Sequence, residues 1–101
     1  MSQAKLRPTE KQIRGSIVDL LRRCGWFVFF LQQGLGSVKG LPDLIAIQDG
    51  RMIFIEVKTP AGSQSHYQKT FERRWRECGG EYFLFRSPED AVKGLGLRVL
   101  L

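Results

Sequence analysis

Residues 43–58 read DLIAIQDGRMIFIEVK, and this stretch decides the architecture of the chain. Asp49-Gly50 separates two apolar runs, and an Asp-Gly pair in that position is a strong signal of a β-hairpin. We therefore predict two antiparallel strands, over 43–47 and 52–58. The turn also sets their register, because a short loop fixes which residues on its two sides lie opposite each other.

The predicted register brings two acidic side chains together. Pairing across the turn places Ile47 opposite Met52, and continuing it places Asp43 opposite Glu56. Directly opposed residues have Cβ atoms about 4.5–5.5 Å apart and share one face of the sheet. Two adjacent carboxylates repel each other and lose hydration there. Either one of them has a raised pKa, or a divalent cation lies between them; oxygen ligands suit Mg²⁺ or Mn²⁺.

Lys58 adds a positive charge to this pair of acids. It follows Glu56 by two residues, so it shares the same face about 6.6 Å further along the strand. An ammonium group there can neutralise charge developing on a phosphate oxygen or orient an attacking water. With a metal ion, these are the groups needed for phosphodiester hydrolysis. The structural alternative is a charged strand end with an Asp at its rim, a common feature of sheet edges.

The rest of the chain predicts an α/β fold. Its 101 residues suit one domain, over 1–101. The order helix, strand, strand, strand, helix, strand, helix indicates a single mixed sheet flanked by helices. The flanking elements that we predict are a helix capped by Thr9 and Gln12, a strand over 26–31 buried on both faces, a helix capped by Ser65 and Gln68, a strand over 81–85, and a short helix from Ser87 to an apolar tail over 95–101.

An excess of basic residues indicates a polyanionic partner. The net charge is +6, from 16 Lys and Arg against 10 Asp and Glu. Two basic pairs, Arg22-Arg23 and Arg73-Arg74, lie on predicted helices, and Lys39 lies in a glycine-rich loop expected to be mobile over the acids. We expect these five residues to contact DNA. The alternative for the helical pairs is a solvated helix face.

Several classes of protein are excluded by the composition. Cys24 and Cys78 lie far apart without ligand spacing, so we predict buried free thiols and no zinc site. The longest apolar run, over 26–31, is too short to cross a bilayer. The polar N-terminus lacks a signal-peptide pattern, so we expect a cytoplasmic protein with no membrane association.

Three motifs together resemble one nuclease family. Gly40-Leu41-Pro42-Asp43-Leu44, then Glu56-Val57-Lys58, then Ser65-x-x-Gln68 are similar to the VRR-NUC family of the PD-(D/E)XK nuclease superfamily. The resemblance extends from Glu10 to Tyr82. It implies a restriction-endonuclease-like fold and a metal-dependent DNA endonuclease, of a type found as stand-alone phage or bacterial domains akin to Holliday-junction resolvases. The roles that it implies are metal ligation by Asp43, Glu56 and the Val57 carbonyl, catalysis by Lys58, an active-site contact by Gln68, and an acidic group near the metal at Glu10.

Glu10 and Gln68 each have a structural alternative. Both lie three and seven residues before apolar positions of their predicted helices, so both are expected to face inward. Glu10 could instead be a first-turn acid that the helix dipole stabilises. Gln68 could cap its helix by bonding to Ser65, and the two roles compete for one side chain.

Three functions follow from these features. The first is a Mg²⁺- or Mn²⁺-dependent DNA endonuclease selective for junctions or branched DNA, acting as a homodimer with two sites related by a twofold axis. The second is a non-catalytic nucleic-acid-binding module on a degenerate nuclease fold. Intact Asp43, Glu56 and Lys58 argue against it, because binding DNA needs basic residues and not paired acids. The third is a subunit of a larger assembly that docks through the apolar tail over 95–101.

Overall fold

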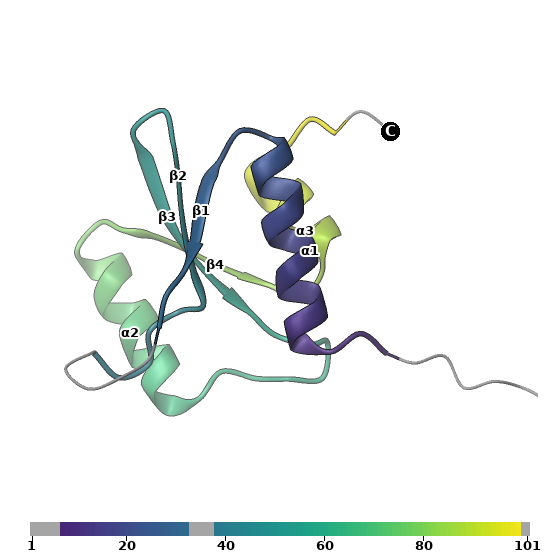
Figure 1. The fold of residues 1–101 in the computed structure, drawn as a ribbon. Coiled ribbons are helices and arrows are strands. Elements are labelled where there is room, and N and C mark those ends of the chain that lie inside the picture. Colours follow the sequence, from purple (N-terminus) through teal and green to yellow (C-terminus); the bar gives the residue numbers. More distant parts are fainter. Residues whose placement is uncertain (1–6, 33–37, 100–101) are drawn as a thin grey trace, which may run out of the picture.

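The computed structural model describes residues 7–32 and 38–99. Their secondary structure follows the predicted order, and the predicted α/β fold with a mixed sheet is confirmed (Figure 1). The elements are α1 (Glu10–Arg23), β1 (Phe27–Phe30), β2 (Leu44–Gln48), β3 (Arg51–Val57), α2 (His66–Glu77), β4 (Glu81–Phe85) and α3 (Pro88–Leu95).

The strands form one sheet in the order β1-β2-β3-β4. The first three run antiparallel to their neighbours, and β4 is parallel to β3. Ile47 pairs with Met52, which confirms the predicted hairpin register. The turn itself has positive φ angles at Asp49 (51°) and Gly50 (78°), the conformation that suits a tight hairpin.

Helices cover both faces of the sheet, but unequally (Figure 1). One face packs against α1 and α3, and the apolar core lies between these layers. On the other face α2 lies over β3 and β4, where Phe54 contacts the rings of Phe71 and Trp75 at centroid distances of 5.6 and 4.3 Å. The two predicted capping boxes, Thr9 with Gln12 and Ser65 with Gln68, are both formed.

The prediction that the first strand is buried on both faces is wrong. Val28 is 2% exposed, whereas Phe27 and Phe29 are 65% and 42% exposed. The reason is tertiary, because β1 is an edge strand and α2 packs against β4 at the other side of the sheet. The run of aromatic residues therefore covers the core on one side only.

Two smaller expectations also change. Cys24 is partly buried, but Cys78 is exposed at the end of α2, so the predicted burial of both thiols is wrong. In the apolar tail, Leu95 and Leu97 pack against the core, and the Leu97 amide donates to the Val92 carbonyl. The start of the tail thus belongs to the fold, while residues 100–101 lie outside the described part of the chain. None of the described helices is both long and apolar enough to cross a membrane.

Candidate active site

Asp43 lies directly before β2, at the position that the hairpin register pairs with Glu56. Its Oδ2 accepts a hydrogen bond of 2.7 Å from the Val57 amide. Its backbone carbonyl accepts a hydrogen bond of 2.8 Å from the Leu31 amide, so the residue directly after β1 also holds Asp43 in place. The structure therefore brings together the two acids that the sequence pattern placed opposite each other.

Glu56 is fully buried. Among the described residues it is the one acidic or basic side chain in the core. The Tyr82 hydroxyl donates a long hydrogen bond of 3.5 Å to Oε2. Oε1 is buried without a hydrogen-bond partner among the described residues. Burial, followed by the nearby Asp43 carboxylate, raises the pKa of Glu56 to about 9, while Lys58 opposes this shift. Without a cation, Glu56 is therefore protonated at neutral pH.

These features fit a divalent cation. The buried carboxyl group of Glu56 lies against the Asp43 carboxylate, and both groups supply the oxygen ligands that Mg²⁺ and Mn²⁺ prefer. The Val57 amide points toward Asp43, and in an extended strand the carbonyl of the same residue points to the same side. The described residues hold no cluster of three or more acidic, His or Cys side chains suited to a metal. An ion at this position would therefore depend on two carboxylates, a backbone carbonyl and water or phosphate.

Arg14 is a site residue that the sequence analysis missed. Its Nη1 lies 3.4 Å from Asp43 Oδ1 and 3.8 Å from Glu10 Oε1. Glu10 therefore reaches the site through Arg14, and after burial and Asp43 it makes a smaller upward contribution to the pKa of Glu56. The signal was present in the sequence, because Arg14 follows Glu10 by four residues and shares its helix face.

Lys58 lies just beyond β3 and is partly buried. Its amide donates to the Phe85 carbonyl at 3.1 Å, which extends the parallel pairing of β3 and β4 and fixes the backbone here. Its positive charge acts on Glu56 by lowering the pKa of that carboxyl, against the larger effect of burial. Lys58 is thus close enough to Glu56 for their charges to interact, and its catalytic role stays a prediction.

Gln68 caps its helix and also borders the site. Its Oε1 accepts a bond of 2.8 Å from the Ser65 amide, so the capping role occupies that oxygen. A hollow of about 390 Å³ is nevertheless lined by both Gln68 and Asp43. We call this the site hollow; its other lining residues are Lys39, Gly40, Leu41, Ser65 and Tyr67.

Gly40 explains why the loop before Asp43 approaches α2 so closely. Its φ angle is +83°, and a Cβ at this position would overlap the backbone between Tyr67 and Gln68. Glycine is therefore required for two reasons, the left-handed conformation and the close contact. The contact ties the loop that carries Asp43 to the first turn of α2.

A solved structure described as "VRR_NUC domain" is similar to this chain. The TM-score is 0.77 at 23% sequence identity, over 88% of this chain and 97% of the other. The chain has the VRR_NUC fold. Neither a family model nor a curated protein matches the sequence. The resemblance drawn from the three motifs is thus confirmed for the fold.

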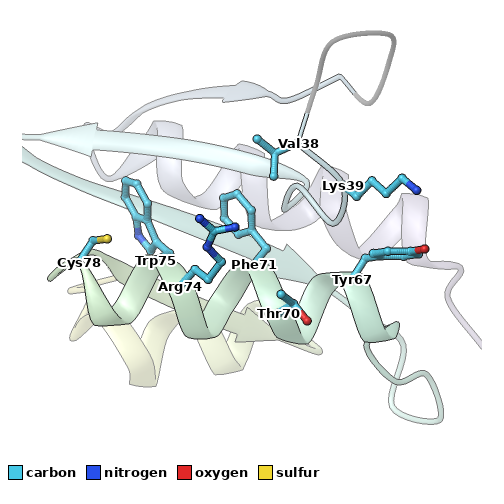
Figure 2. Close-up of a pocket in the computed structure, with 8 residues that line it drawn as sticks. All are labelled: Val38, Lys39, Tyr67, Thr70, Phe71, Arg74, Trp75 and Cys78. Atoms are coloured by element: carbon cyan, nitrogen blue, oxygen red, sulfur yellow. The ribbon is translucent and has the colours of Figure 1, made fainter.

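The basic residues occupy different parts of this VRR_NUC fold. Lys39 lies beside Asp43 in the site hollow, with its Nζ 4.9 Å from the centre of the Tyr67 ring. Arg74 lines a neighbouring groove along α2 (Figure 2). Arg73 does not line this groove, and its Nε lies 3.9 Å from Glu77 Oε1. The last basic pair, at 22–23, lies at the opposite end of α1 from Glu10, about 18 Å along the helix.

Arg22 already has a structural partner. Its Nη2 donates a hydrogen bond of 3.2 Å to the Val28 carbonyl, which connects the end of α1 to β1. Arg23 is exposed beside it. The structure therefore places Lys39 in the site hollow with Asp43, Arg74 in the neighbouring groove, and Arg22-Arg23 at the far end of α1.

Proposed function

We propose that this chain is a divalent-metal-dependent nuclease that hydrolyses phosphodiester bonds in DNA. The observation that carries the proposal is the fully buried carboxyl group of Glu56, whose Oε1 accepts no hydrogen bond from the described residues and which lies against the Asp43 carboxylate. A protein that needed only a stable core would place an apolar side chain there, because burying one acidic group beside another is costly. The VRR_NUC fold supports a nuclease-type domain.

Each site residue then has a role. Asp43, Glu56 and the Val57 carbonyl would hold Mg²⁺ or Mn²⁺, and the bound ion would supply a water of lowered pKa and polarise the phosphate. Lys58 stabilises charge that develops on a phosphate oxygen. Arg14 holds the Asp43 carboxylate in place when no cation is bound.

We further propose that the protein acts as a homodimer on branched DNA. Phe27 pairs with Ile47, and Ile47 pairs with Met52, so these three exposed side chains form an apolar row across three strands. The row begins on β1, an edge strand whose outer side is open to pairing. A twofold dimer would cover this row and present two sites to one junction.

The activity can be tested with labelled duplex, flap and four-way junction DNA, incubated with Mn²⁺, Mg²⁺ or chelator. Metal-dependent cleavage is expected, and Asp43→Asn should abolish it while preserving folding and DNA binding. Asp49→Asn is a matched control, because it removes a carboxylate from the exposed hairpin turn. Cleavage that survives in chelator or in Asp43→Asn would contradict the assignment. DNA binding without cleavage in either metal would indicate the non-catalytic module instead.

A further inference from the structure

A groove of about 430 Å³ runs along α2, next to the site hollow (Figure 2). The two depressions share Lys39 and Tyr67 as lining residues, so the groove continues from the hollow that contains Asp43. Its walls are mainly apolar and aromatic, with Phe71 and Trp75 on the helix and Val38 opposite them. We call this feature the α2 groove.

The aromatic residues of the α2 groove present flat and fixed surfaces. Tyr67 is 52% exposed at its end nearest the site. Phe71 and Trp75 stack with their ring planes within 14° of each other, at a centroid distance of 6.4 Å. Trp75 is also held by a hydrogen bond of 2.9 Å from its Nε1 to the Glu81 carbonyl. These rings are therefore already ordered for a flat ligand to stack on.

The charged residues that line the groove are both positive. Among the described residues, Lys39 and Arg74 line it and no carboxylate does. The Lys39 ammonium lies over the face of Tyr67, and Arg74 lines the groove together with Phe71 and Trp75 (Figure 2). Aromatic surfaces combined with cations along a groove are the features by which proteins bind single-stranded nucleic acid.

The helix is also less buried than its sequence pattern requires. Its apolar residues lie on the inward side, yet no residue of α2 is fully buried. A helix that served only to cover the sheet would bury such a stripe. The aromatic surface that α2 leaves partly uncovered along the groove is therefore available to a ligand. The positive charges of Lys39 and Arg74 favour an anionic one.

We propose that the α2 groove binds unpaired nucleotides of the DNA strand that is cleaved in the active site formed by Asp43 and Glu56. Their bases stack on Tyr67 and on the Phe71–Trp75 pair, and their phosphates contact Lys39 and Arg74. Bases in a duplex are already stacked on each other, so only an unpaired segment can use these surfaces. The inference rests on the proposed function and, among the branched DNAs tested there, favours those that carry an unpaired arm, such as a flap.

The test compares two fluorescent DNAs, a blunt duplex and the same duplex with an unpaired thymidine arm. Anisotropy titrations in chelator measure affinity without cleavage. The wild type should prefer the tailed DNA, and Tyr67→Ala should weaken binding of the tailed DNA by about five- to a hundredfold while leaving the blunt duplex unchanged. Tyr67→Phe keeps the ring and should keep the preference.

Arg74 and Lys69 provide a pair of basic residues on the same helix. Arg74→Ala should reduce affinity for the tailed DNA, whereas Lys69→Ala should not, because Lys69 is exposed on α2 and does not line the groove. Circular dichroism and thermal unfolding check that each variant is folded. Equal affinity of the wild type for the two DNAs would overturn the inference. So would a folded Tyr67→Ala variant that retains the preference.

Cleavage assays separate this inference from the proposed function. If the wild type cuts DNA with metal but binds both DNAs equally, the groove assignment fails and the nuclease assignment stands. If the wild type prefers the tailed DNA but never cuts, the nuclease assignment fails and the groove still binds unpaired nucleotides.

Discussion

At the scale of single residues, Glu56 is the most informative position in the chain. A carboxyl group with no exposed surface and an unpartnered oxygen destabilises a small domain unless it stays protonated or gains a cation. Asp43 strengthens that requirement, because two carboxylates this close do not both ionise readily. The same group therefore links the stability of the metal-free protein to pH.

The first prediction concerns this link. Glu56 has a folded pKa of about 9 against an ordinary value of 4.5, so the folded state binds the proton more tightly than the unfolded state does. Its stabilising effect is complete below pH 4.5 and is lost as the pH rises toward 9. In chelator, the free energy of unfolding should fall with rising pH by up to about 1.4 kcal/mol per unit.

Urea unfolding at several pH values in chelator measures this slope. Glu56→Gln keeps the shape and removes the titration, so it should flatten the pH dependence relative to the wild type. Mn²⁺ should also flatten it in the wild type, because a bound cation replaces the proton. An unchanged slope in Glu56→Gln would mean that another group causes the pH dependence.

At the scale of elements, contacts between neighbouring segments hold the site together. Arg86 shows this after β4, where its Nη1 donates to the carbonyls of Thr59 and Gly62 at 2.7 and 2.6 Å. It thereby fixes the turn that joins Lys58 to α2. Gly40 does the equivalent on the other side, where the loop before β2 meets the start of α2.

The second prediction uses two glycines with nearly the same backbone conformation. Gly40 and Gly79 have φ angles of +83° and +88°. A Cβ added at Gly79 would have open space around it, whereas one added at Gly40 would overlap the backbone of α2. Gly79→Ala should cost the strain of the left-handed region, about 1–2 kcal/mol. Gly40→Ala should cost more and should also lower cleavage, because it separates the Asp43 loop from α2.

Urea unfolding and cleavage rates of the two variants measure the difference. Gly79→Ala serves as the control for strain without a steric clash, and its cleavage rate under folding conditions should match the wild type. Equal stability of the two variants, or full activity of Gly40→Ala, would show that the close contact with α2 does not position Asp43.

At the scale of the whole molecule, exposed apolar surface outside the α2 groove is divided between two places. One is the face of β1, where Phe29 is 42% exposed, and the other is the C-terminal segment, where Val99 is 40% exposed. The sequence pattern favoured the C-terminal segment as a contact surface. Leu95 and Leu97 pack against the core instead, which leaves the β1 side as the larger apolar surface among the described residues.

The third prediction is therefore a dimer that forms through the β1 side. Light scattering over a dilution series should give twice the monomer mass for the wild type. Phe29→Asp should shift the mass to the monomer, because it puts a charge into the interface. Val99→Asp is a matched control of nearly equal exposure and should remain dimeric. A wild-type monomer at micromolar concentration, or dissociation by Val99→Asp alone, would contradict this dimer.

Local chemistry in the sequence determined the helices, the hairpin and its register. Capping boxes at Thr9 and Ser65 and the Asp49-Gly50 turn act over a few residues, so their outcome depends little on the rest of the fold. The turn fixed the register and thereby placed Asp43 opposite Glu56. Directly opposed residues share one face of the sheet, so the two carboxylates lie on the same side.

Only the tertiary structure decided which surfaces are covered and which distant residues reach the site. The position of α2 over β3 and β4 leaves β1 open, although the aromatic run in β1 is as apolar as a buried strand. Arg14 donates a hydrogen bond to Asp43, which is 29 positions away in the sequence. The Lys39 ammonium lies over the ring of Tyr67, which belongs to the first turn of α2. Such contacts depend on how whole elements pack, and side-chain pattern within one segment carries no information about which partner covers it.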